Sequence, residues 1–176
     1  MKVHGMSVNQ TWATPTPIFR LLDDEFRFTL DPCCERETAK VSAKFYTKED
    51  DGLSKDWSED TVFMNPPYGR ELPIWIRKAH RESTKGATVV CLIPARFDPK
   101  YWHDYCLPYG VIAVTEGRIR FEIDGKPCHD SSPPFGPAFV VFCPPEKRET
   151  AILKLTRFGK AYYRLMKKRV HVFQEP

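Results

Sequence analysis

The chain has 176 residues, of which 41% are hydrophobic and 13% aromatic, so it can bury one substantial core but is too short for two comfortable domains. We therefore expect a single domain over residues 1–176. No apolar run approaches membrane-spanning length, and the N-terminus lacks the apolar core of a signal peptide, which predicts a cytoplasmic protein and excludes a membrane protein.

Charge and cysteine content narrow the class of protein further. A net charge of +4 and a pI of about 8.7 permit a polyanionic partner without requiring one. The six cysteines include one adjacent pair and no Cys-x-x-Cys pair, and Cys91 stands inside the apolar run 89–93. This pattern is typical of buried free thiols, so no metal site is expected.

Taken in chain order, the expected elements alternate between helices and strands. Thr16-Pro17 is a good N-cap and N1 pair for a short helix through residues 18–22. Apolar and alternating patterns predict strands at 26–30, 43–46, 61–64, 87–93, 111–114 and 138–143. Further helices are expected at 73–80, at 100–106 and from about 158 to 169. The segment 118–123 and the turn Asp124-Gly125 predict a hairpin.

This order of elements predicts an open α/β sheet that is mostly parallel, with antiparallel strands near the C-terminus. Ligands of such sheets bind at the carboxyl ends of the strands. Asp31 follows the predicted strand 26–30, and Asn65 follows the predicted strand 61–64. We therefore expect both residues at the ligand-binding edge.

The motif Asn65-Pro66-Pro67-Tyr68 is the most informative part of the chain. Two prolines fix two φ angles and remove two backbone donors, which makes a stiff lip at the strand end. The Asn65 side-chain carbonyl and neighbouring main-chain carbonyls could hold both hydrogens of an exocyclic amine and aim its lone pair at an electrophile. Tyr68 offers a flat face for a base. A proline-rich turn that only ends a strand is the plainer interpretation.

Three other segments carry candidate ligand-binding groups. Asp31 could pair with a ligand ammonium through a charge-assisted contact, although an Asp that caps a turn is the simpler reading of Asp31-Pro32-Cys33. Trp12-Ala13-Thr14-Pro15 could be only a proline-rich entry to a helix. Between Asp31 and Asn65, Asp51 and Asp56 could accept from nucleoside hydroxyls or amines and Trp57 could stack on a base. A solvated acidic loop fits those residues equally well.

These motifs resemble the segments of S-adenosylmethionine-dependent amino-methyltransferases, and Asn65-Pro66-Pro67-Tyr68 is similar to the catalytic motif of those that methylate adenine at N6. The motifs occur in one order between positions 12 and 69. The ensemble is similar to the small adenine-specific DNA methyltransferases of bacteriophages and prophages. The resemblance covers roughly residues 10 to 145 and leaves the C-terminal tail undiagnosed.

The resemblance implies a Rossmann-like methyltransferase fold, S-adenosylmethionine as cofactor and N6-methyladenine in DNA as product. It implies a catalytic role for Asn65, Pro66, Pro67 and Tyr68. It implies cofactor contacts for Thr14, Pro15, Asp31, Pro32, Cys33, Asp51, Asp56 and Trp57. The glycines that usually follow the Asp-Pro segment are absent, and Asp31 and Asn65 stand only 34 positions apart. The cofactor half is therefore expected to be abbreviated, and the ribose-binding carboxylate stays unidentified.

Double-stranded DNA is the expected partner, and no membrane partner or metal is expected. The residues predicted to face DNA follow strand ends or lie near the hairpin: Arg96, Lys100, Arg118, Arg120, Lys126 and Phe135. Phosphate contacts would position the duplex, and base flipping would bring the adenine to Tyr68. Ordinary solvated charge explains any single one of the cations as well, and the run Lys167-Lys168-Arg169 is interpreted as a solvated helix end. The single domain leaves no separate target-recognition domain.

Several alternatives stay open at this point. Methylation of cytosine N4, of RNA adenine or of a protein glutamine would use the same acceptor chemistry, and a nucleic-acid-binding protein without catalysis is a further alternative. Methylation of cytosine C5 needs a nucleophilic cysteine. Pro32-Cys33 and Pro127-Cys128 contain one, but neither occupies the position of Asn65 after its strand. The oligomeric state and the target sequence are not predicted.

Overall fold

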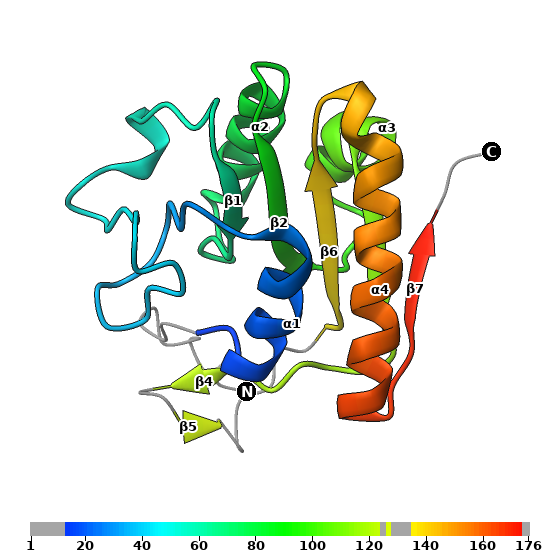
Figure 1. Ribbon diagram of the computed structural model, residues 1–176. Helices are drawn as coiled ribbons and strands as arrows, with labels where there is room; N and C mark the ends of the chain where they lie inside the picture. Colours follow the sequence, from blue (N-terminus) through cyan, green and yellow to red (C-terminus); the bar gives the residue numbers. More distant parts are fainter. Residues whose placement is uncertain (1–12, 124–125, 128–134, 174–176) are drawn as a thin grey trace, which may run out of the picture.

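A computed structural model describes residues 13–123, 126–127 and 135–173 (Figure 1). Its centre is a five-stranded sheet with the strand order β1-β2-β6-β3-β7. The strands are β1 (Thr61–Met64), β2 (Thr88–Pro94), β6 (Pro137–Phe142), β3 (Val111–Thr115) and β7 (Val170–Phe173). The α/β class predicted from the sequence is confirmed.

Strand direction explains how the sheet is both parallel and antiparallel. β1 and β2 pair in parallel, whereas β6 pairs antiparallel with β2 and with β3, and β7 pairs antiparallel with β3. Consequently β1, β2 and β3 run in one direction and only β6 and β7 are reversed. The antiparallel C-terminal strands are confirmed, but β6 lies between β2 and β3, so the pair β1–β2 is the parallel one among the five strands.

On the outer side of β1 the expected strands 26–30 and 43–46 are reduced to isolated bridges. Leu30 pairs in parallel with Val62, and Asp31 pairs in parallel with Phe45. The main cause is α1 (Thr16–Phe26), which takes the first residue of the expected strand. The sheet is therefore continued beyond β1 in the same direction, but only by single pairs of residues.

The helices cover both faces of the sheet. In Figure 1, α1 and α4 (Arg148–Met166) lie in front of the sheet, while α2 (Leu72–Ser83) and α3 (Leu107–Tyr109) lie behind it. Because strand side chains alternate, β1 gives Phe63 to the core under α1 and α4, and Val62 and Met64 to the core under α2. The sheet is therefore packed between two hydrophobic cores.

The remaining elements are short. The 3-10 turns η1 (Gly52–Ser54) and η3 (Pro145–Lys147) precede β1 and α4, and the π-helix η2 (Trp102–Cys106) leads into α3. The predicted hairpin is confirmed as β4 (Glu122–Ile123) and β5 (Lys126–Pro127). Its turn residues lie outside the described residues. Among the helices of the described ranges, none is long and apolar enough to cross a membrane.

Candidate active site

Asn65 and Asp31 lie at the same edge of the sheet, as the sequence predicts. Asn65 directly follows β1, and Asp31 follows Leu30, which is bridged in parallel to Val62 of β1. The carboxyl end of β2 lies beside them, because Met64 pairs with Cys91. The edge therefore collects three consecutive strand ends, which is the position at which open α/β sheets bind ligands.

The lip after β1 is held by short backbone contacts. Pro66 is buried and Pro67 is exposed. The Gly69 amide donates to the Pro67 carbonyl at 3.0 Å, and the Leu72 amide donates to Gly69 at 3.2 Å, so the lip turns directly into α2. No backbone amide in the described part of the chain donates to the Pro66 carbonyl. This carbonyl and the Asn65 side chain are two acceptors on adjacent residues.

Tyr68 is oriented with its hydroxyl inward. Its oxygen lies 3.0 Å from Asn65 Oδ1 and 3.0 Å from the Leu92 carbonyl oxygen. A phenol has one proton, so it donates to one of these oxygens at a time. The ring is half-buried and packs against Phe121 and Phe135, with 6.2 Å between centroids in each case. Burial raises the pKa of Tyr68 well above its ordinary value, so the hydroxyl keeps its proton.

Asp31 is a buried carboxylate, with only 4% of its surface exposed. Burial raises its pKa from 3.8 to about 6, and the backbone amide of Lys40, which donates to Oδ2 at 3.1 Å, opposes that rise. No lysine or arginine side chain within the described ranges forms an ion pair with it. A buried carboxylate without a cationic partner is suited to accept an ammonium group from a ligand.

The segment after Asp31 connects it to the lip. Burial raises the pKa of the Cys33 thiol well above its ordinary value, and the Asn65 backbone amide opposes that rise, so Cys33 lies beside the lip as an unreactive thiol. Gly52 lies against Pro32 so closely that an added Cβ would stand 2.0 Å from the Pro32 carbonyl oxygen. Asp51 is exposed beside this contact. Asp51 is therefore adjacent in the chain to the residue that contacts the Asp31 segment.

The Thr14-Pro15 segment reaches the same region through a small polar network. The Lys40 side chain donates to Thr16 Oγ1 at 3.1 Å and pairs with Glu122 at 3.5 Å, while the Lys40 backbone holds Asp31. Thr14 is 1% exposed, and its hydroxyl oxygen has no partner among the described residues. An unpaired buried hydroxyl is costly, so Thr14 is a fitting contact for a ligand. Lys40 and Glu122 were not predicted, since both stand in polar stretches without a motif.

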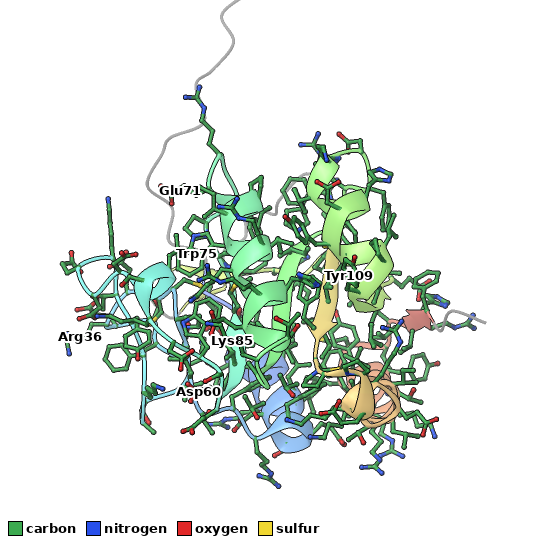
Figure 2. The ribbon with its side chains drawn as sticks, turned by 90° about the horizontal axis from the view of Figure 1, so that it is seen from above. Arg36, Asp60, Glu71, Trp75, Lys85 and Tyr109 are labelled. Atoms are coloured by element: carbon green, nitrogen blue, oxygen red, sulfur yellow. The ribbon has the colours of Figure 1, made fainter. Side chains whose placement is uncertain are left out.

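Two of the residues expected to contact a cofactor lie elsewhere. Trp57 is fully buried, with its ring stacked on Trp75 at 6.2 Å and its indole nitrogen bonded to the Gly52 carbonyl at 3.1 Å. The ring therefore belongs to the core under α2 and has no exposed face for a base. Asp56 is exposed and pairs with Lys85 at 3.6 Å. Figure 2 shows Lys85 and Asp60 together, far along α2 from Glu71 and hence from the lip.

A cleft of about 720 Å³ opens beside Tyr68. Four cations line it, of which Arg96 and Lys100 were predicted and Arg70 and Arg77 were not. Arg96 pairs with Asp98 at 3.3 Å and Lys100 with Asp104 at 2.6 Å. The side chains of Arg70 and Arg77 have no ion pair within the described chain. The position of Arg70 directly after the Asn-Pro-Pro-Tyr-Gly run was the signal that could have identified it.

The other residues predicted to face DNA are not all at the cleft, since the Arg118 carbonyl accepts from Lys168, which follows α4. Phe135 lines the cleft with Tyr68. Arg118 and Arg120 are exposed, because the alternating residues Ile119 and Phe121 turn inward. The side chain of Lys126 and the residues Trp12, Cys128 and 132–134 lie outside the described part. No group of three or more potential metal ligands occurs in the ranges that the structure describes.

An α/β sheet with an amide lip and a buried carboxylate at one edge defines the methyltransferase-like class of fold. The family model described as DNA N-6-adenine-methyltransferase (Dam) matches residues 4–164, so the chain belongs to that family.

Three relatives are consistent with this assignment. The DNA N-6-adenine-methyltransferase of Haemophilus phage HP1 is 33% identical over 114 residues, which cover 62% of this chain and 65% of that protein. The protein of the same name from Escherichia phage T1 is 27% identical over 122 residues, covering 68% of this chain and 50% of the relative. The putative methyltransferase YfdM of Escherichia coli K12 is 40% identical over 68 residues, covering 35% of this chain and 74% of the relative. The chain thus spans one half to two thirds of the two phage proteins.

Proposed function

We propose that this protein transfers a methyl group from S-adenosylmethionine to N6 of adenine in double-stranded DNA. The observation that carries the proposal is the position of the Asn65 amide oxygen at the carboxyl end of β1, beside a half-buried Tyr68 and on the same edge as the buried Asp31. Membership of the family supports it, as do the names of the two phage relatives.

The residues at this edge fit the cofactor. Asp31 would hold the ammonium group, and the buried Thr14 hydroxyl, which has no partner in the described structure, would donate to the carboxylate. The exposed Asp51 carboxylate, next to Gly52, is our candidate for the ribose hydroxyls. The bound cofactor supplies an electrophilic methyl group. Its methionine end would lie along Pro32 and Cys33, which connect Asp31 to the lip.

The lip would orient the nucleophile. Asn65 Oδ1 and the Pro66 carbonyl accept the two hydrogens of the adenine amine, which turns the nitrogen lone pair out of conjugation with the ring and toward the methyl group. The Tyr68 ring stacks on the flipped base. The nitrogen lone pair forms the new N–C bond as the C–S bond breaks, and one amine proton is released to solvent.

The cleft beside Tyr68 would receive the DNA strand next to the flipped base. Arg70 and Arg77 line it without ion-pair partners in the described chain, so they can meet phosphates without first losing a carboxylate. Arg96 and Lys100 would have to exchange Asp98 and Asp104 for phosphate. We therefore assign the stronger phosphate contacts to Arg70 and Arg77.

Nucleoside analysis tests the proposed function. Unmethylated plasmid DNA is incubated with the protein and S-adenosylmethionine, digested and separated by mass spectrometry, with the Asn65→Ala variant as the matched control. N6-methyladenine is expected from the wild type and almost none from the variant. N4-methylcytosine would move the reaction to another exocyclic amine, and an absence of any methylated nucleoside would contradict the proposal.

A further inference from the structure

A second basic surface lies beside β7, which is at the other end of the strand order from β1 and its lip. An open groove of about 590 Å³ runs between the C-terminal half of α4 and β7. Figure 1 shows β7 beside α4 at the edge of the sheet remote from β1. Its polar lining includes Lys160, Arg164, Arg169 and His171, and we call these four residues with the space between them the α4–β7 groove.

The cationic side chains of the α4–β7 groove have no ion-pair partner within the described ranges, although the Glu116 carboxylate accepts from the Arg169 backbone amide. Asp and Glu are absent from its lining, and within the described ranges no carboxylate forms an ion pair with Lys160, Arg164 or Arg169. Elsewhere on α4 the cations are engaged, because Arg157 pairs with Glu25 at 3.6 Å and Lys154 lies 5.2 Å from the Phe26 ring centroid. The groove therefore differs from the ordinary solvated face of a helix, where opposite charges are interspersed.

The groove is built into the fold rather than formed by loose side chains. The Arg169 carbonyl accepts from the Glu116 amide at 2.7 Å, and the Arg169 amide donates to Glu116 Oε2 at 3.0 Å. Gly159 lets α4 approach β7, since an added Cβ would stand 3.2 Å from Val170 Cβ. Exposed Tyr163 adds an aromatic ring between the cations. The backbone positions that present the charges are therefore fixed.

The groove and the lip both lie at the carboxyl ends of the strands β1 and β3. β3 runs in the direction of β1, and its last residue, Thr115, pairs with Val170 at the start of β7. Arg169 therefore lies at the carboxyl edge that also carries Asn65. The strand order places four inter-strand steps between β1 and β7, which is about 19 Å at about 4.8 Å per step. This corresponds to five or six base pairs at about 3.4 Å each.

We propose that the α4–β7 groove is a second DNA-contact surface, which binds backbone phosphates about five or six base pairs from the target adenine. The inference rests on the proposed function, since it assumes that the adenine is presented at Asn65. The groove reads no bases and contributes affinity and orientation. It gives a function to the basic run that ends in Arg169, which the sequence alone indicated to be a solvated helix end.

The test compares two double variants that remove the same charge, one inside the groove and one on α4 outside it. Arg164→Ala/Arg169→Ala empties the groove, and Lys154→Ala/Arg157→Ala removes two cations of α4 outside it. Binding to a fluorescent adenine-containing duplex is measured at several salt concentrations without cofactor. The groove variant is expected to lose about tenfold in affinity at low salt, and the magnitude of its log–log salt slope to fall by about two, since each phosphate contact contributes about 0.9. The control variant keeps the wild-type slope, and thermal melting shows that both are folded.

Duplex length provides a second measurement. When the duplex ends about three base pairs from the adenine on both sides, the groove has no phosphates to bind. The ratio of wild-type to groove-variant affinity is then expected to fall toward one. A ratio that is independent of length would show that the arginines act on something other than distant phosphates and would overturn the proposal.

The remaining outcomes separate this proposal from the proposed function. Wild-type affinity and salt slope in the groove variant would overturn the second surface, while methylation of adenine by the wild type would still uphold the first proposal. A groove variant that binds DNA normally but changes its mass in sedimentation would make the groove an interface between two copies of the chain, which also overturns it. A wild-type protein that neither binds nor methylates DNA would overturn both the second DNA-contact surface and the proposed function.

Discussion

Tyr68 combines two tasks that compete with each other. Its ring borders the cleft, whereas its hydroxyl lies 3.0 Å from the oxygen of Asn65 that would receive the target amine. The Leu92 carbonyl, also 3.0 Å from the hydroxyl, offers the phenol proton another acceptor. When the proton turns to Leu92, the hydroxyl no longer donates to Asn65 Oδ1. The hydroxyl is therefore a competitor of the amine rather than part of its binding site.

Replacement of the acceptor itself should stop the reaction. Asn65→Ala is expected to lower kcat by about 10²–10³-fold, which is the usual effect of losing a hydrogen-bond partner in the transition state. The residue is half-buried at the end of β1, so the fold should persist. Steady-state methylation and circular dichroism measure the two effects. A variant with near wild-type turnover would show that the amine is held by another group.

Substitutions of Tyr68 separate the ring from the hydroxyl. Tyr68→Ala is expected to lose about 5- to 160-fold in kcat/KM, because base stacking on an aromatic ring is worth about 1–3 kcal/mol. Tyr68→Phe keeps the ring and removes the group that competes for Asn65, so its loss should be much smaller. Methylation of the same duplex by both variants makes the comparison. Equal damage would contradict a stacking role.

The buried Asp31 should oppose folding and favour cofactor binding. Its pKa of about 6 lies above the ordinary 3.8, so the folded state binds the proton more tightly. The ionised carboxylate therefore destabilises the fold above pH 6, and the cost disappears as the pH falls from about 6 toward 3.8. Asp31→Asn should equal or exceed the wild-type Tm at pH 7.5, with a smaller advantage at pH 5, and should lose about 10- to 100-fold in cofactor affinity.

Calorimetric titration with S-adenosylmethionine and melting curves at both pH values check this pair of effects. Wild-type affinity should also weaken as the pH falls below 6, since a protonated carboxyl no longer pairs with an ammonium group. Unchanged cofactor affinity in Asp31→Asn would remove this residue from the site, whatever its Tm.

The contact between η1 and the Asp31 segment would position the proposed cofactor site. Gly52→Ala would bring its Cβ to 2.0 Å from the Pro32 carbonyl, so the backbone must shift. We expect a loss of about 1–3 kcal/mol in the free energy of unfolding, as for an overpacked core, and weaker cofactor binding. Gly69→Ala is the matched control, because its Cβ meets nothing within 4 Å. Similar melting of the two variants would show that the Gly52 contact is dispensable.

Elements with one strong periodic signal were predicted best. Strands β1, β2, β3 and β6 are mainly apolar and lie within about two residues of their expected positions. The helix α1 was cut short because Phe26 was counted with a strand, although Ile18, Leu22 and Phe26 complete one helical face. The helix α4 begins ten residues earlier than expected because Ala151 and Leu155 continue the buried face of Phe158.

The positions of candidate site residues were predictable where a motif directly follows a strand. They were not predictable where the contact joins segments that are far apart in the sequence. Asn65, Tyr68 and Asp31 could be placed from their position after apolar segments. Trp57 could not, because an aromatic residue in a polar stretch gives no sign of whether it faces a ligand or Trp75. The link from Lys40 to Glu122 joins segments 82 positions apart, and no local pattern carries it.

Among the described residues, few groups beside the cleft could read a sequence. Of the groups predicted to contact DNA, Phe135 lines the cleft, and the hairpin β4–β5 is bridged to the segment before α1 through Glu122 and Ala13. Sequence readout needs several side chains in a groove, and much of the available charge suits phosphates instead. We therefore expect the affinity for DNA to depend strongly on salt and the recognition to involve few bases.

We accordingly predict a short or degenerate target, such as adenine with one or two preferred neighbours. Sequencing that detects methylated adenines across a plasmid measures this directly, at low and at physiological salt. Modified sites should share few fixed positions, and modification should fall steeply with added salt, because phosphate contacts carry the affinity. Modification confined to one palindrome of about four or more defined bases would mean that the hairpin and the Phe135 loop read bases closely, and that the phosphate surfaces only assist them.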